Sequence, residues 1–91
     1  MTRYQARAFR ALIGRRLRER RLQLGMTQEA LACEAGISQG SVSHYEQGKI
    51  EIPLSVLLDL CDVLEVSPLA IVPGLLPHEP DTNVASEARA S

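Results

Sequence analysis

The chain has 91 residues, 45% of them hydrophobic and 23% charged, which allows one small globular domain and little more. It has no tryptophan, one phenylalanine and two tyrosines, so its core must be mostly aliphatic. No apolar run reaches the roughly 18 residues of a transmembrane helix, and the N-terminus lacks the apolar segment of a secretion signal. We therefore expect a cytoplasmic protein that does not enter a membrane.

The cysteines and histidines form no pattern typical of a metal site or an active site. Cys33 and Cys61 belong to no CxxC pair, and His44 and His78 lie in unlike settings. We expect two free thiols, with one disulfide as the alternative, and neither a metal ion nor a cofactor. We also expect no enzymatic activity, because the sequence offers no nucleophile–base arrangement and no glycine-rich phosphate loop.

The formal net charge of −1 hides an asymmetry between the two parts of the chain. Residues 1–50 carry nine Lys and Arg against four Asp and Glu, a balance of +5. Residues 51–91 carry one Arg against seven acidic residues, a balance of −6. A basic half on a nearly neutral chain indicates an anionic partner on one face, although a solvated arginine-rich helix fits the charge equally well.

Apolar spacing and capping residues predict five helices and no strand. In the first helix, Phe9, Ile13 and Leu17 recur every four residues, which places them on one face. Serine, threonine or proline stands at the start of each later helix, and a glycine follows each of the first three. The predicted helices span residues 6–24, 28–35, 38–47, 53–64 and 68–72.

These helices divide the chain into three parts. Residues 1–8 form an N-terminal extension that continues into the first helix, and residues 9–73 form the domain. Residues 74–91 are largely small, polar and aperiodic, which is typical of a disordered tail. The fourth helix is apolar around most of its circumference, so we expect it to be the core helix of a compact all-α fold.

The second and third predicted helices have the layout of a helix-turn-helix, because a tight glycine-containing turn separates them and the third is mostly polar. They resemble the lambda-repressor/Cro-like (XRE-type) helix-turn-helix family in the stretch TQEALACEAGISQGSVSHYEQGK and in the flanking residues Ile13, Leu17, Arg18, Arg21, Pro53, Leu57 and Leu64. The resemblance covers about residues 9–73. It implies a five-helix lambda-repressor-like DNA-binding domain whose third helix lies in the major groove of DNA.

The resemblance also implies that the exposed N-terminal part of this third helix contacts bases. Gln39 offers a donor and an acceptor, enough to pair with N6 and N7 of adenine. Gly40 has no side chain, so it either lets the backbone approach a base closely or is simply tolerated there. By position, the expected base-contacting residues are Ser38, Gln39, Gly40, Ser43 and His44, with plain solvent exposure as the alternative for each.

Other positions match those with which the family holds the DNA backbone. Gln28 begins the second helix, where an amide and the helix N-terminus together bind a phosphate. The expected phosphate-contacting residues are Gln28, Gln47, Lys49, Arg15 and Arg18. Arg21 and Glu46 match a pair that forms a partly buried structural ion pair between the first and third helices in some relatives.

The main functional hypothesis is a sequence-specific regulator of transcription that binds double-stranded DNA, with no evident small-molecule effector. One alternative is an antitoxin-like protein that binds a protein partner as well as its own operon. Another is an interaction module whose helix-turn-helix has lost DNA binding. The presence of Gln28, Gln39 and Lys49 argues against that last alternative.

We also expect a homodimer on a palindromic operator, because one recognition helix reads only a few base pairs. The apolar end of the domain is the expected contact, and an N-terminal surface with Tyr4 and Phe9 is the alternative. The expected interface residues are Ile71, Val72, Leu75 and Leu76.

Overall fold

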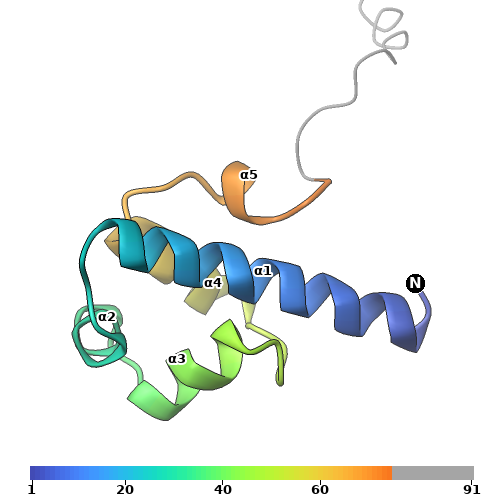
Figure 1. The fold of residues 1–91 in the computed structure, drawn as a ribbon, viewed down its shortest axis with the longest axis horizontal. Helices are drawn as coiled ribbons and strands as arrows, with labels where there is room; N and C mark the ends of the chain where they lie inside the picture. Colours follow the sequence, from blue (N-terminus) through green and yellow to red (C-terminus); the bar gives the residue numbers. More distant parts are fainter. Residues whose placement is uncertain (75–91) are drawn as a thin grey trace, which may run out of the picture.

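A computed structural model describes residues 1–74, which form five helices and contain no strand. The predicted all-α fold and number of helices are confirmed. Figure 1 shows α1 crossing the whole molecule, with α2 and α3 on one side of it, α5 on the other and α4 behind. The helices are α1 (Arg3–Gln23), α2 (Gln28–Ala35), α3 (Gln39–Glu46), α4 (Leu54–Val63) and α5 (Pro68–Ile71).

Helix α1 begins three residues earlier than the apolar spacing predicts. Thr2 and Gln5 form a capping box: the Thr2 hydroxyl accepts a hydrogen bond from the Gln5 backbone N–H at 3.0 Å, and the Gln5 side chain accepts one from the Thr2 N–H at 2.8 Å. The pattern T-x-x-Q was visible in the sequence, but these turns have few apolar residues. Consequently α1 extends past the body of the domain at its N-terminal end (Figure 1).

The predicted caps of α2 and α3 are present. The Thr27 hydroxyl accepts from the Ala30 N–H at 3.0 Å, and the Ser38 hydroxyl accepts from the Ser41 N–H at 3.1 Å. Between the two helices Gly36 has φ of +75°, a left-handed conformation that costs glycine little. This short turn fixes the angle at which α3 leaves α2.

The core is small and aliphatic, as the composition predicts. Its centre consists of four leucines and one valine that are almost fully buried, contributed by α1 to α4 and the residue after α4. Cys61 is buried in this core, whereas Cys33 is exposed, and both are free thiols. The most deeply buried side chains are Leu17, Leu31, Val42, Leu60 and Leu64.

Helix α4 contributes to the core as expected, but part of its apolar circumference remains exposed. Leu57, Leu60 and Cys61 face the core, but Leu54 and Leu58 are 69% and 46% exposed. Pro53 is the N-cap of α4 rather than its first residue. The four-residue helix α5 is too short to cover the second apolar face of α4.

No helix within residues 1–74 is long and apolar enough to cross a membrane.

Helices α1 and α3 approach so closely that a glycine is required between them. A Cβ atom added to Gly14 would lie 2.6 Å from the Glu46 carbonyl oxygen and closer still to that of Tyr45. Near the same place Gly48, with φ of +72°, packs on the Ala11 backbone. The C-terminal end of α3 is thereby pressed against the middle of α1.

We predict that Gly14→Ala destabilises the fold by roughly 1–3 kcal/mol, because the new methyl group must push α3 away from α1. Gly40→Ala is the matched control, since a Cβ there would meet only the Ser38 hydroxyl at 3.9 Å. The control should be neutral or should stabilise by up to about 1 kcal/mol. Urea unfolding followed by circular dichroism measures both changes, and equal stabilities of the two variants would contradict the prediction.

Candidate nucleic-acid interface

A buried ion pair joins α1 to the C-terminal end of α3. Arg21 donates from Nε to Oε2 of Glu46 at 2.7 Å and from Nη2 to Oε1 at 2.9 Å, a two-point contact. Its Nη1 donates to the Met26 carbonyl oxygen at 2.8 Å, which holds the segment leading into α2. The hydrogen bonds to Glu46 raise the pKa of Arg21, so this guanidinium stays charged at any pH at which the fold exists.

Two glutamine side chains extend this ion pair to the start of α3. Gln28 donates from Nε2 to Oε1 of Glu46 at 3.0 Å. Gln39 in turn donates from Nε2 to Oε1 of Gln28 at a longer distance of 3.5 Å. A polar chain therefore runs from the buried Arg21 to the exposed Gln39, and it fixes the direction in which the Gln39 amide points.

The five expected base-contacting residues lie on one helix, but their polar groups are not equally free. Ser38, Gln39, Gly40 and His44 are exposed, and Ser43 is half-buried. The Ser38 hydroxyl caps α3 and also donates to the Ser41 hydroxyl at 3.0 Å. The Ser43 hydroxyl accepts from Nε2 of Gln47 at 2.8 Å. Gln39 and His44 therefore keep polar side-chain atoms that no hydrogen bond among the described residues uses.

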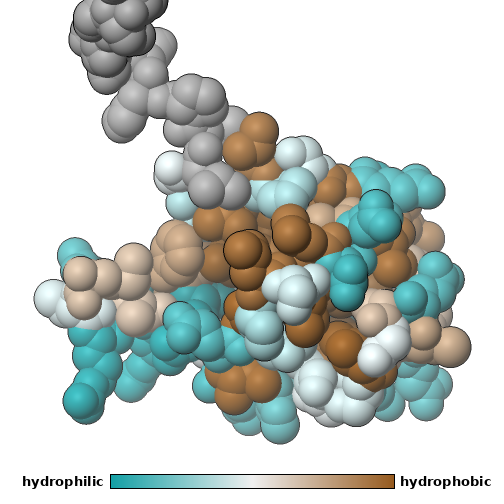
Figure 2. Space-filling model, turned by 180° about the vertical axis from the view of Figure 1, so that it is seen from behind, coloured by the Kyte–Doolittle hydropathy of each residue, from teal (hydrophilic) through white to brown (hydrophobic). Residues whose placement is uncertain are grey.

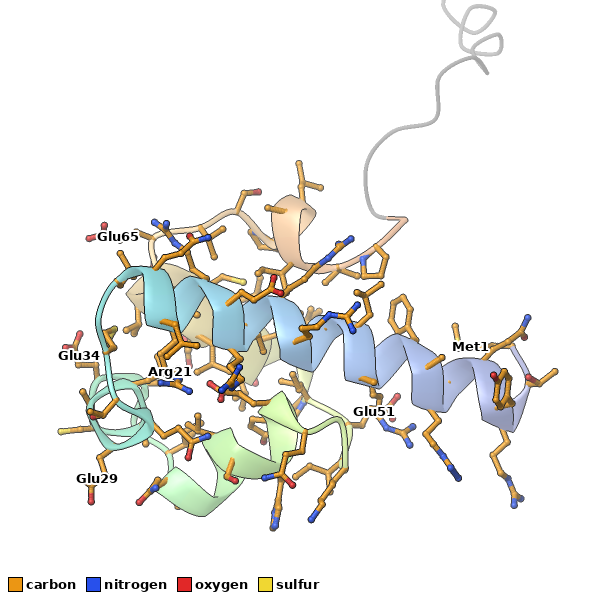
Figure 3. The ribbon with its side chains drawn as sticks, in the orientation of Figure 1. Met1, Arg21, Glu29, Glu34, Glu51 and Glu65 are labelled. Carbon is orange, nitrogen blue, oxygen red and sulfur yellow. The ribbon has the colours of Figure 1, made fainter. Side chains whose placement is uncertain are left out.

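The expected phosphate-contacting residues lie on or next to three elements. Gln28 begins α2, Gln47 and Lys49 follow α3, and Arg15 and Arg18 are exposed on α1. Figure 3 shows α2 and α3 on the same side of α1, with several side chains of α3 directed away from it. Within residues 1–74 no group of three or more His, Cys, Asp and Glu side chains could hold a metal ion.

Two arginines of α1 have a structural role that the sequence did not reveal. Arg20 donates from Nε to the Leu64 carbonyl oxygen at 2.9 Å and from Nη2 to that of Glu65 at 3.2 Å. Arg16 donates from Nη1 to the Ile71 carbonyl oxygen at 3.4 Å. They hold the end of α4 and α5 against α1, on the side away from α3. These two guanidinium groups are therefore not part of the surface that α2 and α3 form.

The expected dimer contact divides into a buried and an open part. Ile71 is only 2% exposed and belongs to the core of its own chain, so it has almost no surface for a partner. Val72 instead lines an apolar groove of about 290 Å³, together with Phe9, Ile50, Leu54 and Leu58. Figure 2 shows hydrophobic surface on this face of the molecule. Leu75 and Leu76 lie outside the described residues.

The chain matches the family model described as "Helix-turn-helix domain" over residues 12–70. It is 39% identical to an uncharacterized transcriptional regulator in the ATPase CF(0) region of Rhodospirillum rubrum over 56 residues, which are 62% of this chain and 52% of that protein. The chain spans about half the length of this relative, or less in others.

Two solved structures with similar folds come from regulators. The restriction-modification controller protein C.AhdI from Aeromonas hydrophila is 32% identical, with a TM-score of 0.69 over 71% of this chain and 94% of that chain. The P22 c2 repressor, crystallised with a synthetic operator, is 35% identical, with a TM-score of 0.66 over 69% of this chain and 96% of that chain. The similarity thus covers nearly all of both solved chains and about 70% of this one.

We predict that Glu46→Ala destabilises the fold by roughly 3–5 kcal/mol, because it leaves the Arg21 charge buried without its partner. Arg21→Met should cost a similar amount for the converse reason. The double variant Arg21→Met/Glu46→Met should cost clearly less than the sum of the two single changes, since it removes both buried charges. Urea unfolding tests this, and single changes below about 1 kcal/mol would show that the pair stabilises little.

Proposed function

The chain belongs to the helix-turn-helix domain family, and on this premise we propose that it is a cytoplasmic, sequence-specific regulator of transcription that binds double-stranded DNA through α3. The observation that carries the proposal is the polar chain from Arg21 to Gln39, which holds an exposed amide at the start of a short, rigidly anchored helix. A helix of eight residues fits the major groove, and its N-terminal residues reach the base edges.

Gln39 is proposed to read an adenine, and Gln28 to support it. The Gln39 amide can donate to N7 and accept from N6 only if its plane is held in the groove. Gln28 is already bound to Glu46, so its own contribution to phosphate binding comes mainly from the backbone N–H groups at the start of α2. Gln47, Lys49, Arg15 and Arg18 are proposed to hold the backbone around this reading position.

The relatives support this proposal over the antitoxin-like alternative. One is described as a transcriptional regulator, and one structural neighbour was solved with a synthetic operator. The side chains of the proposed interface are amides, hydroxyls, cations and one imidazole, groups that can bind base edges and phosphates.

We predict that Gln39→Ala reduces discrimination at one base pair by roughly 1–3 kcal/mol. Gln28→Ala should weaken binding to all sequences by a similar factor and should reduce discrimination at that base pair only in part. The operator is first obtained by selection from random duplexes. Fluorescence anisotropy against single-base variants of it then separates the two effects. Identical profiles for the two variants would contradict the proposed division of roles, and no enrichment in the selection would overturn sequence-specific binding.

The apolar groove between α1, α4 and α5 is proposed as the surface that pairs two copies of the chain. It brings together Val72 and Phe9, which belong to the two surfaces that the sequence suggested separately. Leu54 and Leu58 expose large apolar side chains beside them, and such a patch is costly in water. Leu75 and Leu76, which the sequence suggested for the interface, are proposed to add to the same contact. A second copy would present recognition helices about 34 Å apart on a palindrome.

We predict that Leu58→Asp converts a dimer into a monomer, because it places a charge in this groove. Leu22→Asp is the matched control: Leu22 is 49% exposed but lies outside the groove. Sedimentation equilibrium at micromolar concentration, with and without operator DNA, measures the state. A dimer that tolerates Leu58→Asp would move the interface elsewhere, and a wild-type chain that stays monomeric on DNA would overturn the dimer.

A further inference from the structure

The N-terminal two turns of α1 carry basic side chains beyond the end of α3. Gly48, two residues after the end of α3, packs on Ala11 in the middle of α1. Helix α1 continues for eight residues past Ala11 to Arg3, which is about 12 Å at 1.5 Å per residue. Figure 1 shows this end of α1 projecting clear of α2, α3 and α5.

Three arginines in this projection lie on the face of α1 that is turned towards α3. Gly14 marks that face, because it touches the carbonyl groups at the end of α3. At about 100° per residue, Arg3, Arg7 and Arg10 all fall within about 40° of the direction of Gly14. On this side, α3 packs against the middle of α1. Nearer the N-terminus, beyond the end of α3, the same side of α1 carries these three arginines, here called the basic stripe. Figure 3 shows nitrogen-tipped side chains extending from these turns towards the side on which α3 lies.

The basic stripe is not neutralised by the protein itself. The first 18 residues contain six arginines and no acidic residue. Within residues 1–74 the only ion pair is that of Arg21 with Glu46. Arg3 and Arg7 are exposed, whereas Arg10 is half-buried and also lines the apolar groove, and its buried Nε has no hydrogen-bond partner among the described residues. An uncompensated row of guanidinium groups attracts a row of anionic groups with matching spacing.

We propose that the basic stripe binds backbone phosphates of duplex DNA that flank the base pairs read by α3. The inference rests on the proposed function, and it extends the contact surface beyond the helix-turn-helix. Because α3 and the stripe lie on the same side of α1, a duplex held against α3 passes beneath the projecting turns. The additional reach of about 12 Å corresponds to on the order of three to four base pairs at 3.4 Å each. Such contacts add affinity without altering base preference.

The proposal is tested with the variant Arg3→Gln/Arg7→Gln and two duplexes that contain the selected operator, one with flanks and one trimmed by about four base pairs at each end. For wild-type protein, trimming should weaken binding, and the plot of log K against log salt should become less steep by about 0.9 per lost phosphate contact. The double variant should bind the flanked duplex on the order of tens-fold more weakly at 0.1 M salt. It should respond little to trimming, and its base preferences should be unchanged.

Matched controls separate a local contact from a general effect of charge. Arg7→Gln and Arg16→Gln each remove one charge from α1, but Arg16 points to the side where α5 lies. Only Arg7→Gln should flatten the salt dependence, and Arg3→Lys/Arg7→Lys should restore most of it. Circular dichroism confirms that α1 remains helical in each variant.

Two results would overturn the proposal, and they can be told apart from failure of the proposed function. Equal effects of Arg7→Gln and Arg16→Gln would show only diffuse attraction. A double variant with wild-type salt dependence and wild-type sensitivity to trimming would show that the stripe makes no contact, while loss of discrimination in Gln39→Ala would still support DNA reading. If wild-type protein binds no duplex at all, both the proposed function and this inference fail.

Discussion

The ion pair of Arg21 with Glu46 is the interaction on which the candidate interface depends. It joins the longest helix to the end of α3, and the same arginine holds the Met26 carbonyl group before α2 begins. Burying two opposite charges costs desolvation energy that their attraction offsets only when the geometry is good. Here two short hydrogen bonds, and a third from Gln28 to the same carboxylate, meet that condition.

Close packing and polar bonding fix α3 in complementary ways. Gly14 allows the backbones of α1 and α3 to touch, which sets the distance between the helices. The ion pair holds the C-terminal end of α3 against α1, and the contact between Gln39 and Gln28 links its N-terminal end to α2. An eight-residue helix is unstable alone, so its polar outer face keeps one orientation only because the inner face is fixed by this combination.

The arginines of α1 show how position determines the role of a side chain. Arg21 is buried and paired, Arg16 and Arg20 hold carbonyl groups near α5 and after α4, and the arginines of the projecting turns remain free of any ion pair within residues 1–74. These groups are chemically identical and follow one another on a single helix. Their neighbours differ because α3 and α5 cover opposite sides of α1 over only part of its length.

The sequence determined the five helices, two of the caps that frame the helix-turn-helix and the candidate residues of α3. These features depend on local signals: apolar spacing, a serine or threonine before each helix and a glycine in the turn. It also identified Arg21 and Glu46 as partners through the family resemblance, although 25 positions separate them.

Only the tertiary structure decided which apolar and charged side chains remain available to a partner. Leu54 and Leu58 belong to a helix that reads as a core helix, yet they are exposed because α5 is too short to cover them. From the sequence, Ile71 is expected on the surface at the end of the domain, yet it is buried in the core. Exposure depends on which elements pack together from distant parts of the chain, and neither periodicity nor capping within one helix contains that information.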